Sequence, residues 1–260
     1  MFWLGMTEVH CSMDVPQNPN TGRILDYWLG GNHHFPPDVE AAQAFDALYS
    51  DFPLVFSTLR AFIGRAARTV ADQGISQFLV LGAGIPAQGN VHEAVPQARV
   101  LYTDIDLVNI EIGRQILVDL PGVDYAYCDA ADMATLDQAA ASRILDSADR
   151  LGIVLVGVSV FLDDATVQRT LADLYDWVQP GSLLIADFDG EALVSHPAIL
   201  RILDEAGEPL HLRGPAQIGP LLGRWELLAE GIRPVDVWNN PNAAEPAEVF
   251  MYGCVARKPE

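Results

Sequence analysis

The chain has 260 residues, half of them hydrophobic, which is enough to bury one large core or two modest ones. Its 35 acidic and 15 basic residues give a formal charge of −20 at pH 7, and this charge repels nucleic-acid backbones and anionic lipid surfaces. We therefore expect no nucleic-acid partner and no membrane partner.

The number and positions of the lysine and cysteine residues exclude several kinds of site. The only lysine is Lys258, near the C-terminus, so the body of the fold has no lysine for a Schiff base, a phosphate-binding loop or a Tyr-x-x-x-Lys dyad. Cys11, Cys128 and Cys254 are too few and too scattered for a disulfide framework or a zinc cluster, so no metal site is expected. No secretory signal or membrane span is recognisable, and we expect a cytoplasmic protein, with a homodimer left open.

The first 75 residues show helical patterns and no clear strand. Apolar residues recur at helical spacing in "TGRILDYWLGG" (21–31), "DVEAAQAFDALYS" (38–50) and "LVFSTLRAFIGRAARTVADQG" (54–74). Thr21 is expected to cap the first of these helices. Residues 1–75 are therefore predicted to form an N-terminal helical cap or lid, and residues 76–260 the main domain.

From residue 77 the chain alternates between strands and helices. Five buried strands are predicted at 77–82, 98–104, 123–129, 153–159 and 182–189, with helices between them at 86–95, 106–118, 135–147 and 164–177. Such alternation predicts an α/β fold with a parallel sheet and helices on both faces.

The last part of the chain has a different pattern. Helices are predicted at 195–206 and 215–222, followed by strands at 233–238 and 248–256. The segment between these two strands is too short for a crossover helix, so we predict an antiparallel C-terminal hairpin.

Ligands of an open parallel sheet lie beyond the carboxyl ends of its strands, and the first predicted strand ends in Gly82, Ala83 and Gly84. Glycine permits a tight turn and close approach of a ligand. Pro86 is expected to start the next helix, whose N-terminus attracts an anionic group. An ordinary strand-to-helix turn is the alternative interpretation.

Acidic residues follow the second and third strands. Asp104 is suited to accept hydrogen bonds from both ribose hydroxyls of an adenosine cofactor, whereas Asp106 fits the cap of the next helix. Asp129, followed by Ala130, is suited to the exocyclic amine of adenine, and Asp132 fits another helix cap. These strand ends together favour an adenosine-containing cofactor.

At this point the chain resembles class I S-adenosylmethionine-dependent methyltransferases, and more narrowly an actinobacterial S-adenosyl methyltransferase family formerly of unknown function (DUF574-like). The narrower resemblance rests on "GRILDYWLGGNHHFPPDVEAA", "QFLVLGAGIPAQGNVHE", "ARVLYTDIDLVNI" and "GCVARKP". It implies a Rossmann-like, seven-stranded, mostly parallel sheet whose last strand inserts antiparallel. The implied cofactor is S-adenosyl-L-methionine, with S-adenosyl-L-homocysteine as its product.

The resemblance also implies which residues hold the cofactor. Gly82 and Gly84 would pass under its methionine portion, and Ser159 would face the sulfonium. The full implied set is Gly82, Ala83, Gly84, Asn90, Asp104, Ile105, Asp129, Ala130 and Ser159. His92, in the "GNVHE" motif, is expected to be structural and to bond a neighbouring loop.

The methyl acceptor is expected to lie beside the same strand ends. His33 and His34 are candidate bases, because histidine titrates near neutral pH, with a solvated loop as the alternative. Asp189 is a further acid near this region. The expected substrate-binding residues are Tyr27, Trp28, Phe35, Phe161 and Asp187.

Two departures from the family pattern bear on activity. The triplet Asn32-His33-His34 replaces a Lys-Asp-Asn-type triplet, and Val160 stands where the family tends to have histidine. Both are expected to fall where substrate or cofactor is touched, which puts methyl transfer in doubt.

Three functions remain. No Asp-Pro-Pro-Tyr-like motif or Pro-Cys nucleophile supports base methylation, so we predict a methyltransferase acting on a small molecule, in secondary metabolism. The first alternative is a cofactor-binding protein of the same fold with lost or altered methyl transfer. The second is an NAD-dependent oxidoreductase, since Ala87 completes a G-x-G-x-x-A pattern. The missing Tyr/Lys dyad, Asp129 and the terminal hairpin argue against it.

Overall fold

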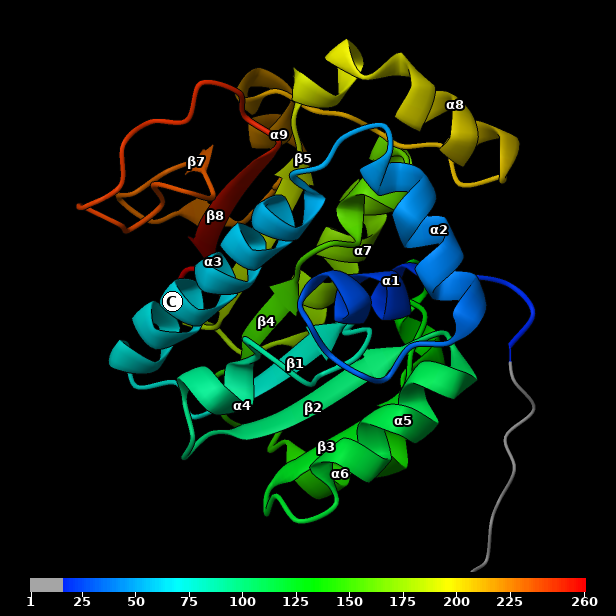
Figure 1. Ribbon diagram of the computed structural model, residues 1–260. Helices are drawn as coiled ribbons and strands as arrows, with labels where there is room; N and C mark the ends of the chain where they lie inside the picture. Colours follow the sequence, from blue (N-terminus) through cyan, green and yellow to red (C-terminus); the bar gives the residue numbers. More distant parts are fainter. Residues whose placement is uncertain (1–15) are drawn as a thin grey trace, which may run out of the picture.

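A computed structural model describes residues 16–260 of the chain (Figure 1). The first 15 residues, which include Cys11 and the start of the predicted cap, lie outside the described part. Within residues 16–260, no helix combines the length and the apolar character needed to cross a membrane.

A single sheet forms the centre of the described fold, with strand order β3-β2-β1-β4-β5-β8-β6 and β7 paired to β8. Its parallel strands are β1 (Gln77–Leu81), β2 (Arg99–Asp104), β3 (Val123–Tyr127), β4 (Gly152–Leu155) and β5 (Leu183–Asp189). The antiparallel strands are β6 (Glu226–Leu227), β7 (Arg233–Pro234) and β8 (Met251–Arg257). The α/β fold class and the C-terminal hairpin, here β7 with β8, are thus confirmed.

Helices bury both faces of the sheet, which explains why its central strands are mostly apolar. One hydrophobic core lies under α3 (Phe52–Asp72), α4 (Val91–Ala94) and α5 (Leu107–Leu117). The other lies under α6 (Gln138–Ile144), α7 (Asp164–Trp177) and α9 (Pro215–Leu221). The carboxyl edge between the two layers is left for a ligand.

The N-terminal helix α1 (Thr21–Trp28) covers that edge, and α2 (Pro36–Asp46) packs against α1. In Figure 1 they lie between α5 and α8 (Pro197–Glu205). A third hydrophobic cluster joins the cap to α8, because Trp28 and Phe45 pack with Phe52 against Ile199. Since α3 begins in this cluster and continues into the core of the sheet, it links the cap to the main domain. The domain division after residue 75 stays a prediction.

The loop after β1 differs most from the sequence prediction. The helix expected at 86–95 is wrong, since only α4 (Val91–Ala94) forms and Pro86 lies in a turn. Gly89 has φ +66°, and a Cβ at this position would lie 2.8 Å from the Arg60 Cβ. The close packing of this loop on α3 therefore prevents the longer helix.

The ends of other elements also differ. The fourth strand ends at Leu155, and Ser159 instead begins a short 3-10 helix, η2 (Ser159–Phe161). The strand predicted at 233–238 is cut to β7, and residues 235–239 form turns. The short strand β6 was not predicted and makes the sheet eight-stranded rather than seven-stranded. Asn20, not Thr21, caps α1, accepting from Gly22 N.

Candidate functional site

A cavity of about 340 Å³ lies at the carboxyl ends of β1 to β4 and under α1. That volume falls in the range of small-molecule sites, roughly 300–1,000 Å³. The implied cofactor-binding residues meet here, with Ser159 as the exception: the lining includes Gly82, Ala83, Gly84, Asn90, Asp104, Ile105, Asp129 and Ala130. Residues from four strand ends and from the cap thus share one cavity.

The glycine turn is held by the carboxylate at the end of β2. Gly84 N donates to Asp104 Oδ2 at 2.8 Å, and Asp106 N donates to Asp104 Oδ1 at 2.9 Å. Burial is the main cause that raises the pKa of Asp104, and these hydrogen bonds oppose it. Each oxygen of a carboxylate has a second lone-pair direction, so Asp104 can still accept bonds from a ligand.

The acid at the end of β3 has a similar arrangement. Asp129 Oδ1 accepts from Ala131 N at 2.8 Å, and Asp129 N donates to Thr135 Oγ1 at 2.8 Å. Asp132 accepts from Ala134 N and caps the 3-10 helix η1 (Met133–Thr135), as the sequence predicted. Asp106 caps α5, which is also confirmed.

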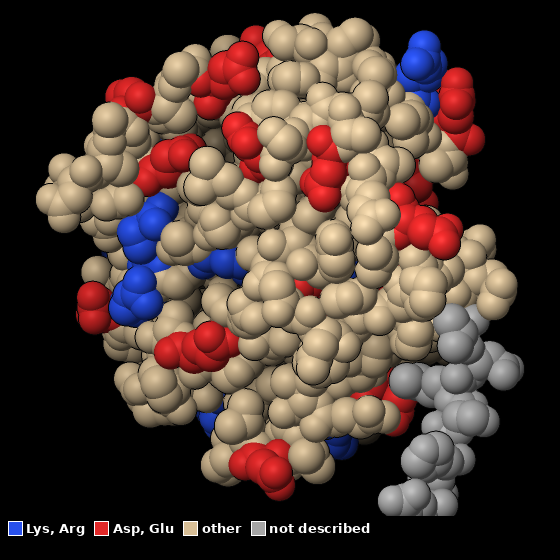
Figure 2. All heavy atoms as spheres, in the orientation of Figure 1, with Lys and Arg blue, Asp and Glu red and all other residues tan. Residues whose placement is uncertain are grey.

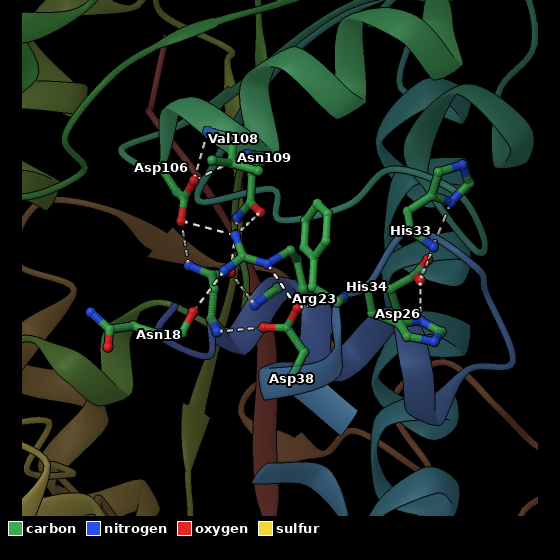
Figure 3. Close-up of polar contacts among 12 residues, drawn as sticks. Asn18, Arg23, Asp26, His33, His34, Asp38, Asp106, Val108 and Asn109 are labelled. Atoms are coloured by element: carbon green, nitrogen blue, oxygen red, sulfur yellow. Dashed lines mark hydrogen bonds and ion pairs between the residues drawn. The ribbon is translucent and has the colours of Figure 1, made fainter. Parts of the chain in front are cut away.

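A buried arginine ties the cap to the main domain (Figure 3). Arg23 is 2% exposed, and its Nε donates to Asp38 Oδ2 at 3.0 Å. Its Nη1 donates to Asp106 Oδ2 and to Asn109 Oδ1, both at 3.2 Å. Asn20 joins the same network, donating to Asp106 Oδ2 at 3.0 Å. The first turn of α1 is therefore fixed to the start of α5, next to Asp104.

The two histidines predicted as bases gather around a carboxylate of the cap instead (Figure 3). His34 Nδ1 lies 3.0 Å from Asp26 Oδ2, and His33 N donates to that oxygen at 2.7 Å. A Cβ at Gly31 would lie 2.1 Å from Asp26 Oδ1, so the loop closes tightly over this side chain. Neither histidine lines the cavity.

The predicted substrate-binding aromatic residues are also dispersed. Phe161 lines the cavity, whereas Trp28 stacks on Phe52 with ring centroids 5.0 Å apart. Tyr27 packs edge-on against His34, and Phe35 lies under the Arg23 guanidinium. These aromatic residues of the cap therefore mainly pack against other residues and do not line the cavity.

Asp187 lies behind the cavity wall and has an unsatisfied oxygen. Its Oδ1 accepts from Gly157 N at 2.8 Å, and Gly157 lines the cavity. Its buried Oδ2 has no hydrogen-bond partner. Burial raises the pKa of Asp187 to about 7, and burial together with Asp187 raises the pKa of the nearby Asp189. A buried carboxyl with a raised pKa and one unsatisfied oxygen beside a ligand cavity is a candidate for proton transfer.

Ser159 does not line the cavity. Its Oγ donates to the Asp187 carbonyl at 2.6 Å, and its own carbonyl accepts from Arg213 Nη1 at 2.8 Å. Val160 is buried, and its carbonyl accepts from His211 N. Since Asn32, His33, His34 and Val160 are all outside the lining, the expectation that the two departures touch substrate or cofactor is not met in this conformation.

Sequence reasoning missed Arg60, which α3 places in the cavity wall. Its Nη1 donates to Asn90 Oδ1 at 2.7 Å, and no carboxylate of residues 16–260 forms an ion pair with it. Burial lowers the pKa of Arg60. In the sequence, the signal for Arg60 was an arginine among the apolar residues of the third predicted helix.

His92 of the "GNVHE" motif was expected to bond a neighbouring loop. Its Nδ1 instead lies 2.8 Å from the hydroxyl of Tyr102, which belongs to strand β2.

Known proteins resemble this chain over nearly its whole length. The model of a family described as S-adenosyl methyltransferase matches residues 7–259. A DUF574 family protein from Streptomyces avermitilis superposes with a TM-score of 0.83 at 26% identity, covering 93% of this chain and 98% of that chain. A protein from Thermobifida fusca gives a TM-score of 0.84 at 27% identity, covering 94% and 96%.

A more distant structure shows the same fold alone. The magnesium protoporphyrin IX methyltransferase of Synechocystis superposes with a TM-score of 0.53 at 12% identity, covering 90% of this chain and 92% of that chain. No curated protein matches the chain.

Proposed function

Because the chain belongs to the S-adenosyl methyltransferase family, we propose that it transfers the methyl group of S-adenosyl-L-methionine to a small molecule held under the N-terminal cap. Membership confirms the family, the enzyme class and the cofactor expected from the sequence. The NAD-dependent alternative does not fit this family. The observation that carries the proposal is the cavity itself, in which the glycine turn, Asp104 and Asp129 meet.

The residues of the cavity fit the cofactor's functional groups. Gly82 and Gly84 line the cavity and would pass under its methionine portion. Both positions require glycine for packing, since a Cβ at Gly82 would lie 2.3 Å from Val158 Cγ2 and one at Gly84 would lie 2.9 Å from the Gly22 Cα. Arg60, a cation without a carboxylate partner among the described residues, suits its carboxylate. Asp104 would hold the ribose, and Asp129 with Ala130 the adenine. When bound, the cofactor supplies an activated methyl group on its sulfonium.

The acceptor is proposed to be small for two reasons. The cavity is partly covered by α1 and lined in part by Phe161, Leu162 and Glu208, and its volume of about 340 Å³ suits a small molecule. The charge of −20 also disfavours nucleic acid. A role in secondary metabolism, a cytoplasmic location and a homodimer remain proposals from the sequence.

Asp187 is proposed as the proton acceptor in place of His33 and His34. Its pKa of about 7 suits a base near neutral pH, and its Oδ1 is hydrogen-bonded to Gly157 N, a residue of the cavity lining. The His34 imidazole is bonded to Asp26, the His33 Nδ1 lies 3.6 Å from the same carboxylate, and neither residue lines the cavity. Positioning of acceptor and sulfonium would supply much of the rate, with the base needed where the nucleophile must lose a proton.

Release of S-adenosyl-L-homocysteine tests the proposal. The chain is incubated with S-adenosyl-L-methionine and a panel of small hydroxyl and amine compounds, and both products are quantified by mass spectrometry. We expect one equivalent of S-adenosyl-L-homocysteine for each methylated acceptor. Cofactor that binds but is never consumed with any compound would instead favour the alternative of lost or altered methyl transfer.

A further inference from the structure

A second hollow lies on the outer side of α3, and we call it the basic pocket. Its volume is about 630 Å³, and its wall includes Arg60, Arg65 and Arg68 of α3. The opposite wall comes from the "GNVHE" motif through Gly89, Asn90 and Glu93. Figure 2 shows basic side chains gathered around a hollow on this face, where acidic side chains are otherwise scattered. Cofactor binding alone does not explain why residues of the "GNVHE" motif also line a second pocket.

The concentration of positive charge in the basic pocket is unusual for this chain. Three of the 15 Lys and Arg residues of a protein with a formal charge of −20 line one hollow. Glu93 is the acidic residue of the lining, and its Oε2 accepts from Gly89 N at 3.2 Å. Like charges on one helix repel each other, so an arrangement of this kind favours an anionic ligand.

Two of the three guanidinium groups have donors to spare. Arg65 is engaged, since it donates to the carbonyls of Trp238 and Val235. Arg60 donates to the neutral amide of Asn90. The Arg68 guanidinium forms no hydrogen bond or ion pair with any of residues 16–260, and it lies over Gly64, 3.5 Å from where a Cβ would stand. An arginine fork offers bidentate hydrogen bonds to phosphate and carboxylate groups.

Arg60 and Asn90 also link the basic pocket to the cofactor cavity. Both residues line both spaces, and they are joined by the 2.7 Å hydrogen bond. A charge placed on the outer side of Arg60 therefore acts on the guanidinium that faces the cofactor's carboxylate.

We propose that the basic pocket binds a small anion carrying phosphate or carboxylate groups, and that this anion weakens cofactor binding by competing for Arg60. The second half rests on the proposed function, in which Arg60 meets the cofactor's carboxylate. Because coupling between two binding sites is reciprocal, the cofactor also weakens binding of the anion.

Calorimetric titration of the full chain tests the basic pocket directly. Pyrophosphate and citrate are titrated separately without cofactor, in buffers held at one ionic strength with NaCl. We expect one equivalent to bind, and the probe that binds more tightly identifies the phosphate or the carboxylate class. Arg68→Gln should weaken this binding at least about tenfold. Arg201→Gln removes an exposed arginine of α8 and serves as the matched control, with unchanged binding expected.

The coupling is measured by repeating the S-adenosyl-L-methionine titration with saturating pyrophosphate or citrate. We expect weaker cofactor binding than in NaCl of equal ionic strength, and no such difference for Arg68→Gln. If neither probe binds, or if the Arg68 and Arg201 variants change anion binding equally, the proposal that the basic pocket binds an anion is wrong. If the anion binds but the cofactor affinity is unchanged, the proposed competition for Arg60 is wrong. If the cofactor never binds, the proposed function and the competition both fail, while the pyrophosphate and citrate titrations still decide the pocket.

Discussion

Gly22 of α1 and Gly84 of the glycine turn touch through their backbones. A Cβ added at Gly22 would lie 2.7 Å from the Gly84 Cα, and one added at Gly84 would lie 2.9 Å from the Gly22 Cα. The cap therefore closes on the turn without any side chain between them. Gly22→Ala should push α1 away and destabilise the protein by about 1–3 kcal/mol. Urea unfolding measures this loss, and a matched Gly219→Ala variant, whose Cβ would meet nothing within 4 Å, should be free of it.

The Arg23 network predicts a large stability loss when its cation is removed. Arg23→Met leaves Asp38, which is fully buried, without its charged partner. Breaking a buried pair from one side costs roughly 3–5 kcal/mol. The control is Arg143→Gln, because its ion pair with Asp124 is largely exposed on the arginine side and should contribute far less to stability. Similar free energies of unfolding for the two variants would contradict the assigned role of Arg23.

The raised pKa of Asp187 predicts that the stability of the protein depends on pH. Burial raises its pKa from 3.8 to about 7 in the folded chain, so the folded state binds more protons than the unfolded state between these values. The stability contributed by the neutral carboxyl is present at low pH and is lost as pH rises through about 7. The loss is at most roughly 1.4 kcal/mol for each pH unit.

Asp187→Asn keeps an oxygen for Gly157 N but cannot ionise. Its stability relative to the wild type should therefore be higher at pH 8 than at pH 5, as measured by urea unfolding at both values. A constant difference between the two proteins would show that Asp187 titrates in its ordinary range.

The positions of His33 and His34 predict that neither residue is required for cofactor binding. Their contacts are with Asp26, which is buried in the cap, and they lie outside the cavity lining. His33→Gln together with His34→Gln should leave the affinity for S-adenosyl-L-homocysteine within about twofold of the wild type, a difference well under 1 kcal/mol. An affinity loss of tenfold or more in calorimetry would place these residues at the cofactor.

The sheet and the cofactor residues could be predicted because they follow from local patterns. Apolar runs mark β1 to β5, and α7 begins and ends where the sequence indicated, at Asp164 and Trp177. Once parallel strands are inferred, their carboxyl ends must share one edge, which brings Asp104 and Asp129 into one cavity.

Features that depend on distant partners could not be predicted in this way. Arg60 meets Asn90, 30 residues further along, and Arg23 meets Asp106, 83 residues away. The loop that holds Gly89 is shaped by α3, and β6 exists only through its pairing with β8. His33 and His34 were expected at the substrate because their titration suits a base, but the nearer Asp26 engages both.

The position of the cofactor is tested most directly by calorimetric titration of the wild type and Asp104→Ala with S-adenosyl-L-methionine, S-adenosyl-L-homocysteine and NAD. The wild type should bind the first two and not NAD. Asp104→Ala should lose affinity for both by more than about tenfold, since it removes the acceptor for the ribose hydroxyls. Circular dichroism establishes that the variant is folded. Unchanged affinity in a folded Asp104→Ala protein, or failure of the wild type to bind either compound, would contradict the account.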